Sequence, residues 1–278
     1  MKYLELSIDA VIKEPWNEIL ISDLSDIGFE SFLEDESGVL KAYIGISSFD
    51  EEKLNMLLKN RKQHVSLTHQ TQVLPEENWN AAWEAQFSPV LISNQLEIIA
   101  PFHVSTIKNG YTLVIEPKMT FGTGHHQTTY LICSYLLKYP PTNKQVLDMG
   151  TGTGVLAILS EKLGAKSIDA VEIEDWSVEN ANENTERNNC SRIKVIHGSK
   201  EQIPDKYYDL ILANINRNIL EDQLSEYAKH ANSGSTLLLS GFFSTDDSQL
   251  KEIAVQNDYE FGSNYSKDDW SMLQFIKR

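Results

Sequence analysis

The residues best suited to chemistry follow a short apolar stretch that runs into Asp148 and then into the glycine-rich run Gly150-Thr-Gly-Thr-Gly154. Glycines at this spacing let the backbone turn tightly and approach a bound ligand closely. An apolar strand that ends in such a turn and opens a helix indicates a ligand crevice at the carboxyl end of a parallel sheet. Asp148 precedes the first glycine by two residues, where we expect its carboxylate to reach the amino-acid end of a ligand.

Two polar residues end the apolar stretches that follow. Glu172 lies about 20 residues after Gly150, where a carboxylate can accept both hydroxyls of a ribose. Asn214 follows the apolar run 210–213, which places it over the same crevice, beside the reacting centre. Asn214 has a second interpretation, because it can instead cap a helix that begins near Arg217.

The glycine run alone does not choose between two cofactor classes. Gly152-x-Gly154-x-x-Ala157 also fits the dinucleotide fingerprint, so an NAD-binding oxidoreductase is a rival interpretation. Such an enzyme needs an acid or base placed beside the hydride acceptor, and the sequence offers no clear candidate. The set of Asp148, Glu172 and Asn214 instead favours S-adenosylmethionine (SAM) as the ligand and methyl transfer as the reaction.

The elements that must position these residues begin at residue 90. Strand-like and helix-like stretches alternate from there to residue 278, which predicts an α/β domain with a mostly parallel sheet covered on both faces. The expected strands include residues 90–100. The last two strands follow one another closely, so we expect them to pair antiparallel at the end of that sheet.

The first part of the chain has a different pattern. Residues 1–75 give the order β-α-β-β-α-β, which is the ferredoxin-like arrangement. Residues 76–89 are expected to form a linker helix, since Trp79, Trp83 and Phe87 recur at helical spacing and share one face.

Composition narrows the function further. The chain carries 40 acidic and 24 basic residues, for a net charge of -16, which disfavours a broad nucleic-acid surface and suits a basic partner. No stretch approaches the roughly 20 apolar residues of a membrane span. The two cysteines, without a CxxC pair or a leader segment, favour a cytoplasmic protein, and we expect a monomer. His125 and His126 have no partner at metal-ligand spacing, so no metal site is expected.

The segment from Glu116 to Thr129, EPKMTFGTGHHQTT, resembles the FGTGxHxTT signature of bacterial ribosomal-protein methyltransferases of the PrmA type. The resemblance continues through VLDMGTGTGVLAI, AVEIEDW, ENANEN and DLILANI, and it includes the expected linker helix. It therefore spans nearly the whole chain.

The resemblance implies a Rossmann-like, seven-stranded class I methyltransferase domain behind a small α+β ferredoxin-like domain that recognises the substrate. It implies that SAM is bound by Thr129, Gly150, Glu172 and Asn214, with Asn214 also the catalytic residue, and that no metal is needed. The implied reaction methylates lysine side chains and the N-terminal amine of a basic protein of the large ribosomal subunit.

The chain departs from the family pattern at several positions. Lys118 stands where the family has glycine, Glu116 and Glu172 replace aspartates, and Ile215-Asn216-Arg217 replaces Ile-Leu-Ala after Asn214. These departures leave the shape of the acceptor pocket open. A class I methyltransferase acting on a small molecule or another protein, and a non-catalytic ribosome-associated binding module, therefore remain alternatives.

Overall fold

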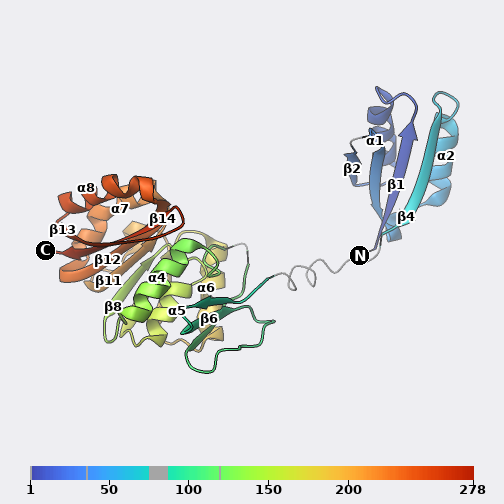
Figure 1. The fold of residues 1–278 in the computed structure, drawn as a ribbon. Coiled ribbons are helices and arrows are strands. Elements are labelled where there is room, and N and C mark those ends of the chain that lie inside the picture. Colours follow the sequence, from blue (N-terminus) through green and yellow to red (C-terminus); the bar gives the residue numbers. More distant parts are fainter. Residues whose placement is uncertain (1, 36, 75–86, 119) are drawn as a thin grey trace. The chain divides into compact units, whose positions relative to one another are not determined.

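The computed structural model describes residues 2–35, 37–74, 87–118 and 120–278 (Figure 1). The chain divides into two compact units, Met1–Phe87 and Ser88–Arg278, each with its own sheet and core. The expected linker helix over residues 76–89, with Trp79 and Trp83, lies mostly outside the described residues. Residues 87–89, which are described, have no regular secondary structure.

The first unit follows the order β-α-β-β-α-β and forms a four-stranded antiparallel sheet in the order β2-β3-β1-β4. Its elements are β1 (Tyr3–Ala10), α1 (Trp16–Asp26), β2 (Ser31–Glu34), β3 (Leu40–Gly45), the short η1 (Ile46–Ser48), α2 (Glu51–Arg61) and β4 (Leu67–Val73). Alternate residues of β1, such as Leu6 and Ile8, are fully buried with Leu20 and Leu24 of α1. The alternation that predicted a half-buried strand thus supplies the core of this unit.

The second unit is built on a seven-stranded sheet in the order β10-β9-β8-β11-β12-β14-β13. Only β14 runs antiparallel to its neighbours β12 and β13, as expected for the last two strands. The elements are α4 (Gln127–Lys138), β8 (Gln145–Met149), α5 (Val155–Lys162), β9 (Ser167–Glu172), α6 (Asp175–Arg187), β10 (Ile193–His197), η2 (Lys200–Gln202), β11 (Tyr208–Asn214), α7 (Arg217–Lys229), β12 (Ala231–Phe243), η3 (Ser244–Asp246), α8 (Asp247–Gln256), β13 (Tyr259–Lys267) and β14 (Trp270–Lys277).

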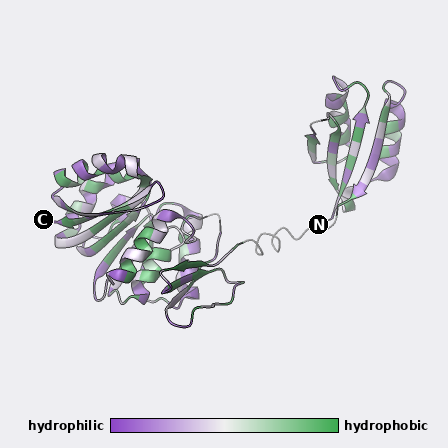
Figure 2. Ribbon diagram, viewed as in Figure 1, coloured by the Kyte–Doolittle hydropathy of each residue, from purple (hydrophilic) through white to green (hydrophobic). Residues whose placement is uncertain are grey.

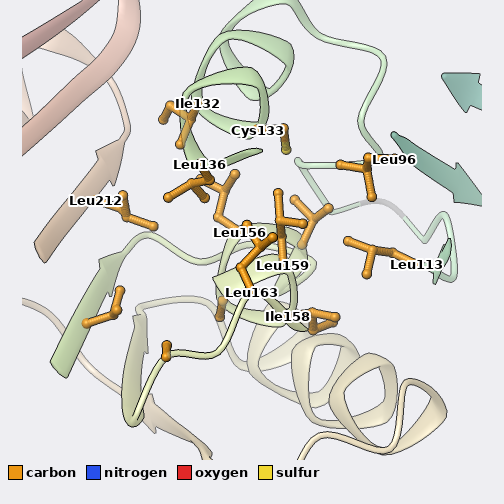
Figure 3. Packing of buried hydrophobic residues seen from close by; sticks show 14 of the residues in the cluster. Leu96, Leu113, Ile132, Cys133, Leu136, Leu156, Ile158, Leu159, Leu163 and Leu212 are labelled. Atoms are coloured by element: carbon orange, nitrogen blue, oxygen red, sulfur yellow. The ribbon is translucent and has the colours of Figure 1, made fainter. Parts of the chain in front are cut away.

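Helices cover both faces of this sheet, because successive residues of the parallel strands point to opposite faces. Leu210 and Leu212 of β11 join the core beneath α4 and α5, which Figure 3 shows from close by. Ile211 and Ala213 join the core beneath α7 and α8. Hydrophobic residues are accordingly concentrated in the central strands (Figure 2). Among the described residues, no helix has the length and apolar character to cross a membrane.

A separate three-stranded sheet, β5-β6-β7, precedes the signature segment. It consists of β5 (Val90–Ile92), β6 (Leu96–Ile99) and β7 (Tyr111–Val114). The prediction of one strand over residues 90–100 was therefore wrong. Ser93 and Asn94 both have positive φ, 51° and 53°, and they turn the chain into a hairpin.

Candidate active site

A cavity of about 480 Å³ runs along the carboxyl ends of the sheet. The cavity passes six neighbouring strands in their order in the sheet, and each strand contributes a lining residue from its end or from the loop next to it. These residues are Ser199 after β10, Glu172 of β9, Gly150 after β8, Asn214 of β11, Gly241 of β12 and Trp270 of β14. This is the position in which open α/β sheets bind ligands.

The glycine turn between β8 and α5 forms the centre of the cavity wall. Gly150 and Gly152 have φ values of 67° and 56°, which residues with a side chain rarely adopt. A Cβ on Gly152 would lie 2.3 Å from the carbonyl oxygen of Phe121. Thr153 fixes this approach, because its backbone N donates to Phe121 O at 3.0 Å and its Oγ1 donates to Gly122 O at 2.7 Å. The FGTG segment that begins at Phe121 and the glycine turn, about 30 residues later in the chain, thus form one continuous surface.

Glu172 lies in the cavity wall and is 7% exposed. Its Oε2 accepts from Gly152 N at 2.9 Å, while Oε1 accepts from Ile173 N at 2.8 Å and from Glu174 N at 3.2 Å. Three backbone N–H groups therefore hold the carboxylate in place. Oε2 accepts this single hydrogen bond, so one of its lone pairs stays available for a ligand.

Asp148 is not among the residues that line the cavity, contrary to the expectation that it reaches the ligand. It lies beneath the glycine turn, 1% exposed, and its Oδ2 accepts from Thr151 Oγ1 at 2.6 Å. Burial is the main cause that raises the pKa of the Asp148 carboxyl to about 7; hydrogen bonds from Thr151 and from the backbone of Ala157 oppose the rise, and the nearby Glu172 charge adds to it.

Asn214 lines the cavity at the end of β11. Its Oδ1 is buried and has no hydrogen-bond partner among the described residues. The alternative in which Asn214 caps the next helix was wrong, because the N-cap of α7 is Asn216. Arg217 pairs with Asp246 at 2.9 Å and is not a lining residue, so the departures after Asn214 do not put a cation into the cavity.

Thr129 sits in the first turn of α4, fully buried, and is not a lining residue. Its Oγ1 has no hydrogen-bond partner among the described residues, and the same holds for Thr120 Oγ1 in the cavity wall. Buried hydroxyls without partners are uncommon in native structures, and at Thr120, which lines the cavity, the unpaired hydroxyl can be satisfied by a polar ligand.

Sequence reasoning missed an aromatic wall at the Asn214 end of the cavity. His126 lies between Phe121 and Trp270, with ring centroids 5.1 Å and 4.4 Å away, and Trp270 also packs on Phe243 at 4.2 Å. Burial lowers the pKa of His126, so the ring is neutral at neutral pH. The signature pointed to Phe121 and His126, whereas nothing in the sequence around Trp270 distinguishes it from an ordinary strand residue.

Asparagines on α6 tie the segment before the signature to the glycine turn. Asn184 is fully buried; its Oδ1 accepts from Glu116 N at 2.9 Å and its Nδ2 donates to Thr153 O at 3.0 Å. Lys118, which stands in place of the family's glycine, has ordinary backbone and pairs with Glu183 of α6 at 2.6 Å.

His197 is the last residue of β10; its Nε2 lies 2.9 Å from Ile173 O, and it is not a lining residue. Among the residues that the structure describes, no three His, Cys, Asp or Glu side chains are grouped so that they could hold a metal ion.

Comparison with known proteins identifies the family. Residues 17–278 match the family described as "Ribosomal protein L11 methyltransferase (PrmA)". The chain belongs to this family. A ribosomal protein L11 methyltransferase of Porphyromonas gingivalis is 39% identical over 284 residues, which cover 99% of this chain and 98% of the relative. Its counterpart in Phocaeicola vulgatus is 38% identical over the whole of both chains.

A solved structure agrees with this assignment. The crystal structure of a ribosomal protein L11 methylase from Lactobacillus delbrueckii subsp. bulgaricus has 28% sequence identity and a TM-score of 0.64, covering 69% of this chain and all of that one. The resemblance to the PrmA family and the expected Rossmann-like class I methyltransferase fold are confirmed. The chain is a SAM-dependent methyltransferase, and the oxidoreductase interpretation is not supported.

Proposed function

We propose that this PrmA-family chain transfers methyl groups from SAM to lysine side chains and to the N-terminal amine of ribosomal protein L11, a basic protein of the large ribosomal subunit. The names of its relatives support this substrate. The observation that carries the chemistry is Asn214 Oδ1, a buried acceptor without a partner among the described residues, in the wall of the cavity at the strand ends.

The residues of the cavity suit the cofactor. In the proposal Gly150 allows close backbone contact with the methionine part, and Glu172 accepts the ribose hydroxyls. One ribose hydroxyl donates to the available lone pair of Glu172 Oε2. The other donates to Oε1 and replaces its hydrogen bond from Glu174 N, which at 3.2 Å is the longest of the three hydrogen bonds from backbone N–H groups. Asn214, which lines the cavity, satisfies its orphaned oxygen on the same ligand, whereas Thr129, which the resemblance also named, lies outside the cavity wall and makes no ligand contact in the proposal. SAM supplies an activated methyl group on a sulfonium.

The protein's task is then to present a neutral amine in line with that methyl group. A lysine ammonium, with an ordinary pKa near 10.4, must first lose its proton, and desolvation in an apolar pocket favours the neutral form. The wall of Phe121, His126 and Trp270 provides such surroundings beside Asn214 Oδ1, which accepts a hydrogen bond from the amine and orients its lone pair.

His126 is not the proton acceptor in this proposal. Its Nδ1 accepts from Thr128 N at 3.3 Å, which leaves the hydrogen of the neutral ring on Nε2. The two lining carboxylates, Glu172 and Glu174, lie at the end of β9 and just after it, and β9 is two strands away from β11, the strand that ends in Asn214. Solvent takes the proton before the amine enters the pocket.

The first unit serves in the proposal as the substrate-recognition domain. The net charge of -16 attracts a basic protein, and it disfavours direct binding to the ribosomal RNA. The proposal places the protein in the cytoplasm, where its substrate is made. Cross-linking the full chain to purified L11 is expected to yield peptides from residues 2–74; cross-links confined to residues 88–278 would contradict this role.

Asn214→Ala tests the reaction. We expect a fall in turnover of about a hundredfold, as for other lost transition-state contacts, with a smaller loss of SAM affinity. The readout is mass spectrometry of L11 after incubation with enzyme and SAM, in which each transfer adds one methylene. Asn232→Ala, at the opposite end of the sheet, is the matched control. Near-normal turnover of Asn214→Ala would refute the role of Asn214.

A further inference from the structure

The end of the cavity farthest from the aromatic wall carries a polar pair that the proposed reaction does not use. Gln223, on the second turn of α7, is 6% exposed and lines the cavity. Its Nε2 donates to Ser199 Oγ at 3.3 Å, and Ser199, which follows β10, lines the cavity as well. The pair thus joins a helix on one face of the sheet to the end of β10.

A buried tyrosine sets the orientation of this pair. Tyr227 is fully buried one turn after Gln223, and its hydroxyl donates to Gln223 Oε1 at 2.6 Å. Burial raises the pKa of Tyr227, so the hydroxyl keeps its proton. Because the amide oxygen is occupied in this way, the amide presents its N–H groups, and not its oxygen, toward Ser199 and the cavity.

Two hydrogen-bond donors remain at this end. One N–H of Gln223 binds Ser199, which leaves the second N–H of the amide and the hydroxyl hydrogen of Ser199 without acceptors among the described residues. A ligand group that fits here must therefore offer lone pairs. When a buried donor of the protein faces a donor of the ligand, both groups stay without a hydrogen bond, and each lowers the binding free energy.

The strand order determines which part of the cofactor reaches this pair. Along the sheet, Ser199 follows β10, Glu172 ends β9 and Asn214 ends β11, on the far side of β8. With the ribose on Glu172 and the methyl group toward Asn214, the remaining part of the cofactor, its purine ring, extends toward β10.

We propose that Gln223 and Ser199, oriented by Tyr227, select the adenine base of the cofactor by donating to its ring nitrogens. This inference rests on the proposed function. Adenine offers acceptors on both sides of C2, at N1 and N3, so this edge suits two donors, whereas N1 of hypoxanthine carries a hydrogen and meets a donor there. Sites that hydrogen-bond a ligand reject analogues that leave their buried groups unpaired. Gln223 is then a specificity-determining residue, and Tyr227 is a positioning residue that acts through it.

The test is calorimetric titration of the full chain with S-adenosylhomocysteine and with its deaminated analogue, S-inosylhomocysteine. We expect the wild-type chain to bind the adenine ligand at least about tenfold more tightly. Gln223→Glu replaces the donor with an acceptor, so the preference should reverse toward the hypoxanthine ligand.

A matched pair of variants isolates the role of Tyr227. Tyr227→Phe should reduce the preference for adenine about threefold to tenfold, because the amide is free to turn over. Tyr259→Phe is the control: Tyr259 is also fully buried in the same core cluster, but its hydroxyl has no partner among the described residues. That variant should keep the wild-type preference.

The outcomes separate this inference from the proposed function. A wild-type chain that does not bind S-adenosylhomocysteine would contradict both. A chain that binds the two ligands equally well, or a folded Gln223→Glu variant that still prefers adenine, would overturn the inference and leave the methyltransferase assignment in place. The comparison of the two ligands on the wild-type chain needs no variant, so it tests the inference even if a variant misfolds.

Discussion

Asp148→Asn tests the burial of a carboxyl group beneath the cofactor turn. In the folded chain the Asp148 pKa is about 7, against an ordinary value of 3.8. Between these values the unfolded chain has lost the proton and the folded chain still holds it. Asp148 therefore lowers the free energy of unfolding as pH rises from about 4 to about 7, and the whole of this loss of stability is present above pH 7.

The size of the effect follows from the shift. One pKa unit corresponds to about 1.4 kcal/mol, so the cost of ionising Asp148 grows by about 2 to 3 kcal/mol between pH 5 and pH 8. Asparagine has no charge to desolvate, and it keeps an acceptor for Thr151. Relative to the wild type, Asp148→Asn should gain that amount of stability over the same pH range, a rise of roughly 5 to 10 °C in melting temperature.

Differential scanning calorimetry at pH 5 and pH 8 measures this gain and separates the transitions of the two units. Asp205→Asn, an exposed aspartate of the same unit without a bonded partner among the described residues, is the matched control and should show no such trend. If the melting temperatures of the wild type and Asp148→Asn change in parallel between pH 5 and pH 8, the reasoning from burial is wrong.

Three further predictions concern the same site. Glu172→Gln should weaken SAM binding about tenfold by calorimetry while Glu172→Asp weakens it less, because only a carboxylate accepts at both oxygens; equal binding by Gln and Asp variants would contradict this. Gly152→Ala should lower the melting temperature more than Gly234→Ala, since both glycines have positive φ but only the first Cβ meets backbone, at 2.3 Å. Asn184→Ala leaves Glu116 N, which is partly buried, and Thr153 O, which is buried, without their side-chain partner, and it should cost about 2 to 4 kcal/mol of stability. It should also raise KM for SAM more than it lowers kcat; an unchanged KM would show that the residue does not position the turn.

The sequence predicted those parts of the fold and site that depend on local pattern. Alternation of apolar residues at strand and helix spacing indicated both units, because that alternation is what buries one face of each element. Glu172 and Asn214 could be placed at the carboxyl edge of the sheet because a polar residue that ends an apolar strand must emerge there. Gly150 could be placed in the turn because glycine tolerates such a backbone conformation.

Other features depend on contacts between distant residues, which local pattern does not show. Trp270 reaches the cavity only because β14 inserts between β12 and β13. The Asp148 spacing was consistent with ligand contact, yet the side chain points beneath the turn to Thr151. Gln223 looked like an ordinary polar residue of an amphipathic helix, and only its contacts with Tyr227 and Ser199 place it at the cavity.

Titration of the full chain with SAM and, separately, with NAD, together with mass spectrometry of ribosomal proteins incubated with chain and SAM, decides whether the chain methylates a ribosomal protein. We expect binding of SAM alone and successive additions of single methylenes to one basic protein, L11. SAM binding without any change in mass of a ribosomal protein would contradict the proposed substrate and favour a small-molecule methyltransferase or a binding module. Binding of NAD in place of SAM would contradict the account as a whole.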